Sequence, residues 1–376
     1  MSLRPVPVTT KRSPAVPTAV NRRHKLRLAV LAAALVLSAA CGAHRSQEPA
    51  APVTTVPTQT QPTTTASNTI SLVAVGDLML ARDIATLTDD NGSTYPFEHV
   101  APVLADADIT VANLEGTFTE RGTAADKKYT FRTPPRDATG LALAGIDVVS
   151  MANNHALDFG PEGLRDTIAA LDSAGIAHSG AGENDVAARR PAILQARGLR
   201  VAFLSYAATT DAVAAAPDAA GVAWGTVDTI SEDVRRAREQ ADVVVVSLHA
   251  GNEYADEPSD TQRLLAQAAV DAGATLVLGH HPHVLQSWEF SGRAFIAYSL
   301  GNFVFDLDED DLAQLGPAPF QTVALKIDLS ASGVEKVEPI PVYIDPQEDR
   351  PRPADPAEAE AILDRIRQLG GELETP

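Results

Sequence analysis

The sequence predicts an α/β domain built on a largely parallel β-sheet. Short apolar segments rich in β-branched residues suit buried strands, and the clearest of them, 242–248, contains four consecutive valines. These segments alternate with segments of ten or more residues that suit helices, as expected when helical crossovers join parallel strands. The chain has 376 residues, of which 45% are hydrophobic and 21% charged, so it can bury a sizeable core.

The predicted strands are apolar runs, and several of them end directly before Gly, Asp, Asn or His. In chain order they are 70–75, 109–112, 147–151, 191–195, 200–205, 242–248, 275–278, 295–299, 321–329 and 336–343. The fourth and fifth lie close together in the chain, and we expect them to form a hairpin. No internal repeat is visible.

The predicted helices lie between these strands. They are 95–105, 134–144, 161–174, 231–240, 258–272 and 355–369. The helix 161–174 has the clearest signals, because Pro161 opens it and Gly175 follows its last residue. The acidic run 306–311 lacks the glycine and the spacing of an EF-hand loop, so we expect a solvated loop there.

The N-terminal residues have the pattern of an export signal. A basic segment, 21–27, precedes an apolar run, 28–40, that is short for a spanning helix. The run closes with LSAAC, which resembles a bacterial lipoprotein cleavage site with Cys41 as the acylated residue. Ordinary signal cleavage and retention as a short anchor are the alternatives. Residues 42–68 are rich in Pro and Thr and are expected to form an extended tether.

Charge and cysteine content exclude some partners. The formal net charge is −19, which argues against nucleic acid and against simple adhesion to anionic lipid. The single cysteine excludes an intrachain disulfide framework. We therefore expect no nucleic-acid partner, and we expect contact with a membrane only through a lipid anchor.

Polar side chains follow five of the apolar strands directly. They are Asp77, Glu115, Asn154 with His155, His249, and His281 with His283. Because ligands bind at the carboxyl ends of strands in open α/β sheets, we expect these side chains to meet at one edge of a single sheet. Alternate residues of an extended turn point the same way, so His281 and His283 are expected to converge, with Pro282 stiffening the turn. Taken singly, each has a structural alternative, such as a turn residue or a satisfied core histidine.

Mixed nitrogen and oxygen ligands suit Zn, Mn or Fe, whereas soft thiolates and an all-oxygen shell are absent from this set. One or two divalent ions at this place could activate a water and stabilise an oxyanion.

The ordered motifs resemble the capsule-synthesis family CapA, also called PgsA, of poly-γ-glutamate producers. They are VAVGDLMLAR (73–82), ANLEGTFT (112–119), YTFRTPP (129–135), SMANNHALDFGPEGLRDT (150–167), GAGEN (180–184), LHAGNEY (248–254), GHHPHVLQ (279–286) and YSLGNFVFD (298–306). The family is similar in fold to calcineurin-like metallophosphoesterases, so the resemblance implies a sandwich of two β-sheets flanked by helices. Together with the N-terminal pattern and the predicted elements, it divides the chain into a signal peptide with a lipobox (1–41), a tether (42–68), a CapA-like domain (69–345) and a C-terminal helical extension (346–376).

The resemblance also implies roles for individual residues. The implied metal ligands are Asp77, Glu115, Asn154, His249, His281 and His283. His155 would lie beside the reacting group as an acid or oxyanion stabiliser, so His155 and Asp77 are the expected catalytic residues. The expected substrate-binding residues are Arg82, Arg132, Glu253, Tyr254 and Asn302. For Arg82 and Arg132 a surface ion pair is an equal alternative.

Three positions depart from the family patterns. Met79 occupies the place of the imidazole in the Asp-x-His motif of calcineurin-like enzymes, and Glu115 replaces their bridging aspartate. Ala250 stands where a tryptophan usually follows the first histidine of the LHAGNEY segment. Loss of an imidazole is expected to weaken one of two metal positions, so the number of ions stays open at one or two.

These observations predict an exported, lipid-anchored protein at the outer face of the cytoplasmic membrane. It would act in synthesis, release or export of a capsule polymer of the poly-γ-glutamate type, by metal-dependent hydrolysis or transfer at a phosphoester or γ-glutamyl amide. The alternative is a non-catalytic subunit that binds the polymer or its precursor beside a membrane synthetase complex. A fold supports many substrates, so the identity of the anionic envelope polymer stays open.

Overall fold

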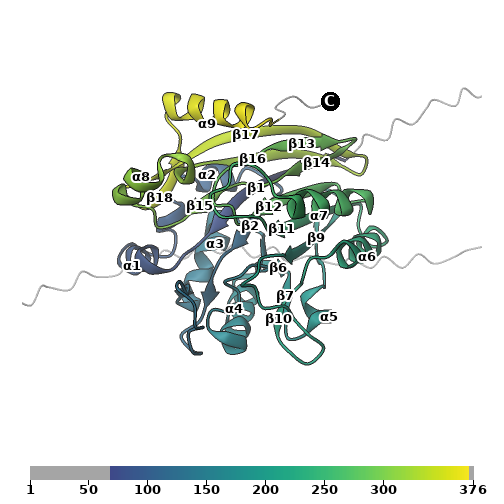
Figure 1. Cartoon of the computed structure of the whole chain (residues 1–376), viewed down its shortest axis with the longest axis horizontal. Helices are drawn as coiled ribbons and strands as arrows, with labels where there is room; N and C mark the ends of the chain where they lie inside the picture. The colour runs from purple at the N-terminus through teal and green to yellow at the C-terminus, as the bar shows by residue number, and fades with distance from the viewer. Residues whose placement is uncertain (1–67, 372–376) are drawn as a thin grey trace, which may run out of the picture. The chain divides into compact units, whose positions relative to one another are not determined.

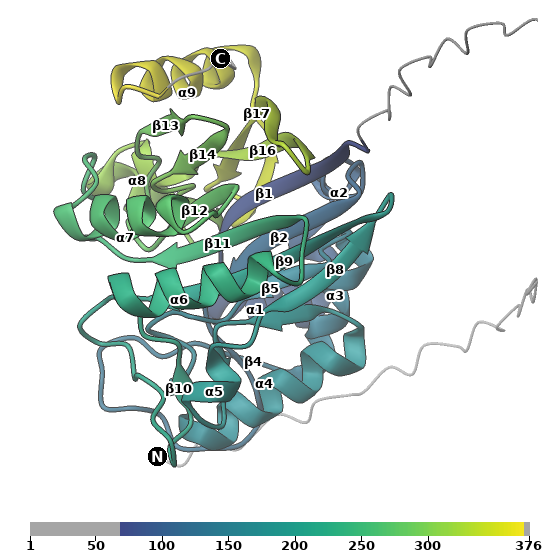
Figure 2. The ribbon, with the colours of Figure 1, turned by 90° about the vertical axis from the view of Figure 1, so that its right-hand side faces the viewer.

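The computed structural model describes residues 68–371. Cys41, the apolar run before it and most of the predicted tether lie outside these residues. Within 68–371, no helix combines the length and the apolar character needed to cross a bilayer. The described chain contains two large β-sheets with helices on their outer faces (Figures 1 and 2).

The first large sheet has eight strands. They are β1 (Ile70–Leu78), β2 (Ile109–Leu114), β5 (Val148–Ser150), β6 (Ala177–Ser179), β15 (Asn302–Val304), β16 (Gln321–Ser330), β17 (Gly333–Asp345) and β18 (Arg350–Pro353). Their order is β18-β17-β16-β1-β2-β5-β6, with β15 also paired to β1. The strands β1, β2, β5 and β6 are parallel, whereas β16, β17 and β18 continue the sheet in antiparallel fashion.

The second large sheet has six strands. They are β8 (Ala192–Ala196), β9 (Leu199–Ala207), β11 (Val243–His249), β12 (Leu276–His280), β13 (Trp288–Ser291) and β14 (Ala294–Ala297). Their order is β13-β14-β12-β11-β9-β8, with a parallel centre and an antiparallel strand at each edge. Two short pairs lie apart: β3 (Thr117–Phe118) with β4 (Arg132–Thr133), and β7 (Ala181–Gly182) with β10 (Gly221–Val222).

Within residues 68–371, helices surround the two sheets. They are α1 (Arg82–Asn91), α2 (Ala101–Leu104), α3 (Ala138–Ala144), α4 (Gly160–Ala174), α5 (Asp185–Ala188), α6 (Val227–Arg238), α7 (Asp260–Asp271), α8 (Glu309–Leu315) and α9 (Pro356–Gln368), with 3-10 turns η1 (Tyr95–Phe97), η2 (Pro135–Asp137) and η3 (Ala318–Phe320). Figure 2 shows α6 and α7 lying against the second sheet.

The valine strand β11 shows how the layers are built. Val243 and Val245 pack in the core between the two sheets, together with residues of β1 such as Leu72. Val244 and Val246 point to the other face, where they pack against α6 and α7. Successive side chains of a strand alternate between faces, so a strand that is apolar throughout must be covered on both. The two-sheet sandwich flanked by helices that the resemblance implied is therefore confirmed.

Three local predictions are wrong. The single sheet expected from strand–helix alternation is two sheets, because alternation does not say which strands pair. The helix expected at 95–105 is the turn η1 followed by α2, interrupted at Glu98–Val100. The acidic run 306–311 is not simply a loop, because Asp308 caps α8 and accepts hydrogen bonds from the backbone N–H groups of Asp310 and Asp311.

Candidate metal centre

The carboxyl ends of strands from both sheets meet at one place. In the first sheet Asp77 of β1 is in register with Asn113 of β2, which precedes Glu115 by two residues. In the second sheet His249 of β11 is in register with His280 of β12. Parallel pairing brings these ends to one level within each sheet, and packing of the sheets brings the two groups together.

Two glycines allow the backbone to pass closely beside these ends. A Cβ atom on Gly76 would lie 1.9 Å from the carbonyl oxygen of Gly301, and one on Gly279 would lie 1.8 Å from that of Tyr298. No other residue type fits such contacts. The glycines that precede Asp77 and His280 are therefore required by close approach to the chain segment around Tyr298–Gly301.

Asp77 lies at the middle of the cluster and is fully buried. Its Oδ1 accepts a hydrogen bond from Asn113 Nδ2 (2.9 Å) and lies 3.1 Å from His280 Nδ1. Its Oδ2 accepts from the backbone N–H of His281 (3.3 Å) and lies 3.5 Å from His283 Nδ1. Burial alone would raise the pKa of Asp77, but contacts with His280, His283 and Asn113 hold the pKa below its ordinary value. Asp77 is thus an ionised carboxylate aimed into the cluster.

Glu115 is the second buried carboxylate, and its charge is not balanced. Neither of its oxygens has a hydrogen-bond partner within residues 68–371. Nε2 of His155 and Nε2 of His283 each lie 3.8 Å from its Oε1. Burial, followed by repulsion from Asp77 and Glu253, raises the pKa of Glu115 well above its ordinary value. A bare buried carboxylate is unfavourable unless a cation pairs with it, so this side chain fits a metal ligand.

The imidazole of His249 faces an oriented amide. Its Nε2 lies 2.9 Å from Asn154 Oδ1, and Asn154 Nδ2 donates to Asp211 Oδ2 (2.8 Å). The contact with Asp211 keeps the amide oxygen toward the histidine. Burial and the neighbouring imidazoles lower the pKa of His249 well below its ordinary value, so the ring is neutral and suited to ligation. The rings of His249 and His281 are 4.8 Å apart.

The turn after β12 is not extended, contrary to expectation. His281 and His283 have φ values of 96° and 58°, so the turn uses left-handed backbone rather than alternation along an extended segment. Burial lowers the pKa of His281 to about 4, and its Nδ1 has no hydrogen-bond partner in the described chain. Both imidazoles nevertheless face the cluster.

Asn302 orients His283. Asn302 Nδ2 donates to the carbonyl oxygens of His283 (3.2 Å) and Pro319 (3.1 Å), so its Oδ1 is left as an acceptor 2.9 Å from His283 Nδ1. His283 therefore carries its proton on Nδ1, and the lone pair of Nε2 points toward Glu115. Asn302 thus orients the candidate ligand His283 and does not line either cavity beside the cluster.

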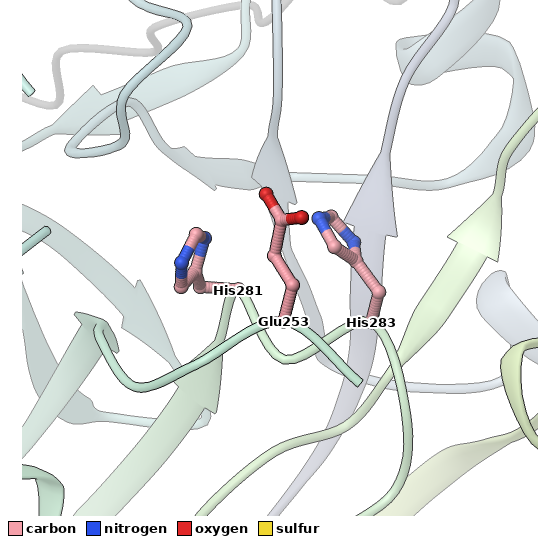
Figure 3. Close-up of side chains that lie close together, drawn as sticks. All are labelled: Glu253, His281 and His283. Atoms are coloured by element: carbon pink, nitrogen blue, oxygen red, sulfur yellow. The ribbon is translucent and has the colours of Figure 1, made fainter. Parts of the chain in front are cut away.

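Within residues 68–371, two sets of three His or acidic side chains each have one potential ligand atom per side chain, and these atoms lie within 4.8 Å of one another. One set is Asp77, Glu115 and His283, and the other is Glu253, His281 and His283. Figure 3 shows the Glu253 carboxylate standing between the two imidazoles of the second set. Carboxylate and neutral imidazole together suit Zn, Mn or Fe, and the unpartnered atoms of Glu115 and His281 fit a divalent cation at this centre.

His155 lies beside the cluster and is held in one orientation. Its Nδ1 lies 2.7 Å from Asp158 Oδ2, and the ring stacks on Phe131 at 4.1 Å. Asp158 also accepts from the backbone N–H of Phe131 (2.6 Å) and pairs with Lys127 Nζ (2.8 Å). Burial lowers the pKa of His155, and Asp158 offsets part of that effect. His155 Nε2 consequently faces Glu115 and the cleft.

Two cavities border the cluster, and Glu253 lines both. One, of about 170 Å³, is lined by Arg82, Tyr129, Tyr254 and Phe305 among others. The other, of about 530 Å³, is lined largely by hydroxyl, amide and carboxylate side chains on the side of His281. A ligand can thus reach the centre from both sides of Glu253.

The two arginines predicted for substrate binding are placed differently. Arg82 lines the smaller cavity, half exposed, with its Nε 2.9 Å from Asp306 Oδ2. Arg132 lines neither cavity, because its guanidinium stacks 3.6 Å from the centre of the Phe159 ring and donates to the carbonyl oxygens of Arg121 and Gly122. The positive charge expected from Arg132 is therefore absent from the cluster.

Several residues of the site were not predicted. Asn113 and Asp158 stand inside the quoted motifs, two residues before Glu115 and three after His155, and their spacing was a usable signal. Asn153 is similar, because its Oδ1 accepts from the backbone N–H of His155 (3.0 Å). Asp211 lies in an alanine-rich loop after β9, where no sequence pattern points to it.

Comparisons with known proteins cover the part of the chain that contains the candidate site. The sequence model of a family described as bacterial capsule synthesis protein PGA_cap matches residues 71–307, which include every expected metal ligand. The capsule biosynthesis protein CapA of Bacillus anthracis is 36% identical over 249 residues, 63% of this chain and 60% of that protein. The PGA biosynthesis protein CapA of Bacillus subtilis (strain 168) is 34% identical over 247 residues, 65% of each. The chain thus spans less than two thirds of the length of these relatives.

Among solved structures, a hypothetical protein from Thermus thermophilus matches with a TM-score of 0.46 and 18% identity, over 72% of this chain and 98% of that one. The NAD nucleotidase of Haemophilus influenzae matches with a TM-score of 0.41 and 10% identity, over 80% of this chain and 56% of that one.

Proposed function

The chain belongs to the bacterial capsule synthesis protein PGA_cap family, and on that basis we propose that it is a metal-dependent hydrolase or transferase acting on an anionic cell-envelope polymer. The observation that supports this most is the meeting of two buried carboxylates and three buried imidazoles, drawn from strand ends of two sheets, at the border of two cavities. The named relatives act in capsule or PGA biosynthesis, which supports a polymer of the poly-γ-glutamate type as substrate.

The residues that would hold a divalent cation are Asp77, Glu115 and His283 on one side, with Asn154, His249 and His281 adjoining. When bound, such a cation (Mn, Zn or Fe) lowers the pKa of a water and polarises a phosphoryl or acyl oxygen. Asp77 remains ionised through its contacts, and Asn302 keeps the lone pair of His283 Nε2 directed at the centre.

His155 supplies proton transfer. With Nδ1–H donated to Asp158, its Nε2 faces the cleft, where it would take the proton that the attacking water gives up and pass that proton to the leaving oxygen or nitrogen. Lys127 neutralises Asp158, and Phe131 covers the other face of the imidazole, so the ring keeps its orientation through the transfer. Arg82, half exposed in the smaller cavity, offers a guanidinium to a carboxylate or phosphate of the substrate.

A second candidate function is binding without catalysis, as a subunit of a polymer synthetase complex. Met79 favours it, because this residue stands where a further imidazole was expected and is fully buried with Ala81 and Phe131 in a small apolar cluster. A position filled by packed apolar atoms adds no ligand.

The discriminating experiment compares the purified protein with His155→Ala after removal of metal and resupply of Mn or Zn. Phosphodiester and γ-glutamyl amide substrates are tested in parallel, and metal content is measured for both proteins. Catalysis predicts turnover that falls at least a hundredfold in the variant at unchanged metal content. Equal background rates in both proteins with metal bound would support the binding role, and absence of bound metal would contradict both hydrolysis and transfer.

Export and lipid anchoring are part of the proposal. The basic segment, the apolar run and the LSAAC sequence ending at Cys41 support them. The test is fractionation of cells that carry the native chain or Cys41→Ser, with incorporation of labelled fatty acid as the readout. A lipoprotein incorporates label only in the native chain, and label in neither protein, or in both, would contradict acylation at Cys41.

A further inference from the structure

Glu253 is a third carboxylate at the metal centre, and no group of the described chain balances its charge. It lies in the loop between β11 and α7 and is exposed to solvent. Its side chain makes no hydrogen bond and no ion pair within residues 68–371. One of its oxygens nevertheless lies within 4.8 Å of ring nitrogens of both His281 and His283 (Figure 3).

The loop is held in this place by the turn that carries the two imidazoles. The backbone N–H of Tyr254 donates to the carbonyl oxygen of Pro282 (2.8 Å), and that of Ala250 donates to the carbonyl oxygen of His280 (3.2 Å). These bonds bracket Glu253, so its position relative to His281 and His283 does not depend on a free loop. These backbone hydrogen bonds therefore keep Glu253 close to the two imidazoles.

Backbone strain is concentrated at the same place. Six non-glycine residues within 68–371 have positive φ, and they include Tyr254, His281 and His283. Left-handed backbone at such residues is strained and persists where surrounding structure requires it. Here the strained residues are those that aim Glu253 and the two imidazoles at one another, which a merely solvated glutamate does not need.

We propose that Glu253 is a ligand of a second divalent cation, which it holds together with His281, beside the position formed by Asp77, Glu115 and His283. His283 belongs to both sets of nearby ligand atoms, so the two positions are neighbours. Nδ1 of His281, buried and without a partner in the described chain, supplies the nitrogen lone pair. The centre thus holds two cations although Met79 is no ligand.

The number of cations decides what kind of substrate the centre attracts. Asp77, Glu115 and Glu253 carry three negative charges, so one divalent cation leaves the centre negative and two leave it positive. The protein as a whole is strongly acidic, and Arg132 is engaged with Phe159 and backbone carbonyls away from the cluster. A second cation is therefore what lets an acidic protein bind the phosphates or carboxylates of an anionic polymer. This consequence rests on the proposed function, whereas the ligand assignment does not.

The test is a count of bound cations. The purified full-length protein, freed of metal with a chelator, is titrated with Mn²⁺ by calorimetry, and its metal content after gel filtration is measured by mass spectrometry. We expect two ions per chain for the native protein and one for Glu253→Gln. Glu257→Gln, an exposed residue of the same loop whose carboxylate lies 3.5 Å from Arg263, is the matched control and is expected to keep two.

Two further readouts separate ligation from a structural effect. Glu253→His is expected to keep two ions, because an imidazole is also a ligand for Mn²⁺. The native protein is expected to show the electron paramagnetic resonance pattern of two coupled Mn²⁺ ions, and Glu253→Gln that of one isolated ion. A native count of one, or a count of two in Glu253→Gln, would overturn the inference and leave a one-cation hydrolase standing. A native count of zero would overturn the metal-dependent function as well.

Discussion

The substitution Glu115→Gln is expected to make the metal-free protein more stable than the native protein. When metal is added, the variant is expected to be the less stable of the two. In metal-free protein the substitution removes a buried carboxyl group that lies beside Asp77, has no hydrogen-bond partner in the described chain and, because its pKa is raised well above the ordinary value, favours taking up a proton on folding. Uncompensated burial of a polar group costs about 1–3 kcal/mol, and more for a charged group. The variant should therefore be more stable than the native protein by roughly that amount in a chelator. Since 1 kcal/mol corresponds to about 2 °C in a domain of this size, Tm should rise by about 2–6 °C.

With metal the order changes. A ligand at one hundred times its Kd stabilises the folded state by about 2.7 kcal/mol, or about 5 °C on the same scale. The native protein should gain this increment, whereas Glu115→Gln, which lacks one of the three ligands of the first set, should gain much less. The two melting curves should thus exchange places between chelator and Mn²⁺.

The assay is thermal unfolding followed by circular dichroism, in chelator and across a Mn²⁺ series, with Glu257→Gln as the control whose curve should follow the native one. A variant less stable than the native protein in chelator would refute the assignment of Glu115 as an uncompensated carboxylate. Equal stabilisation of both proteins by Mn²⁺ would refute its role as a ligand.

Three further outcomes are expected. Asp158→Asn removes the charge that holds His155 Nδ1, so kcat should fall about 10–100-fold at unchanged metal content. A changed metal content would mean that Asp158 acts on the ligands instead. Asn302→Ala frees the ring of His283 and should weaken Mn²⁺ binding about 10–100-fold by calorimetry, and unchanged affinity would show that the ring needs no orientation. Burial raises the pKa of Asp306 to about 7, despite the nearby charge of Arg82. Between about pH 4 and pH 7 the folded state then binds more protons than the unfolded state, so the free energy of unfolding falls as pH rises through this window. Asp306→Asn should flatten this dependence on pH when stability is measured by urea unfolding. An equal dependence on pH in the native protein and the variant would contradict the raised pKa.

Much of the candidate metal centre was predictable because its candidate ligands lie at or directly after strand ends. Apolar β-branched runs ending at Gly76-Asp77, at Asn113-Leu114-Glu115 and at Gly279-His280 are local signals, and sheet geometry brings the ends of parallel strands to one rim. The helix with the clearest signals, α4, was also predictable from local sequence, since Pro161 and Gly175 mark its ends. The position of Asp158, three residues after His155, can be read from the sequence. The contact between the two side chains cannot.

What the sequence alone determined about this protein is most of the longer strands and helices, the types of side chain at the strand ends and the family to which the chain belongs. The tertiary structure decided that the strands form two sheets. It also decided that the loop residues Asp211 and Glu253 lie next to the candidate ligands, and that Arg132 lies against Phe159 instead of at the cluster. The reason is the range of the interactions. Periodicity and end signals act over a few residues, whereas the meeting of Asp77 with a turn roughly two hundred residues later depends on how whole sheets pack.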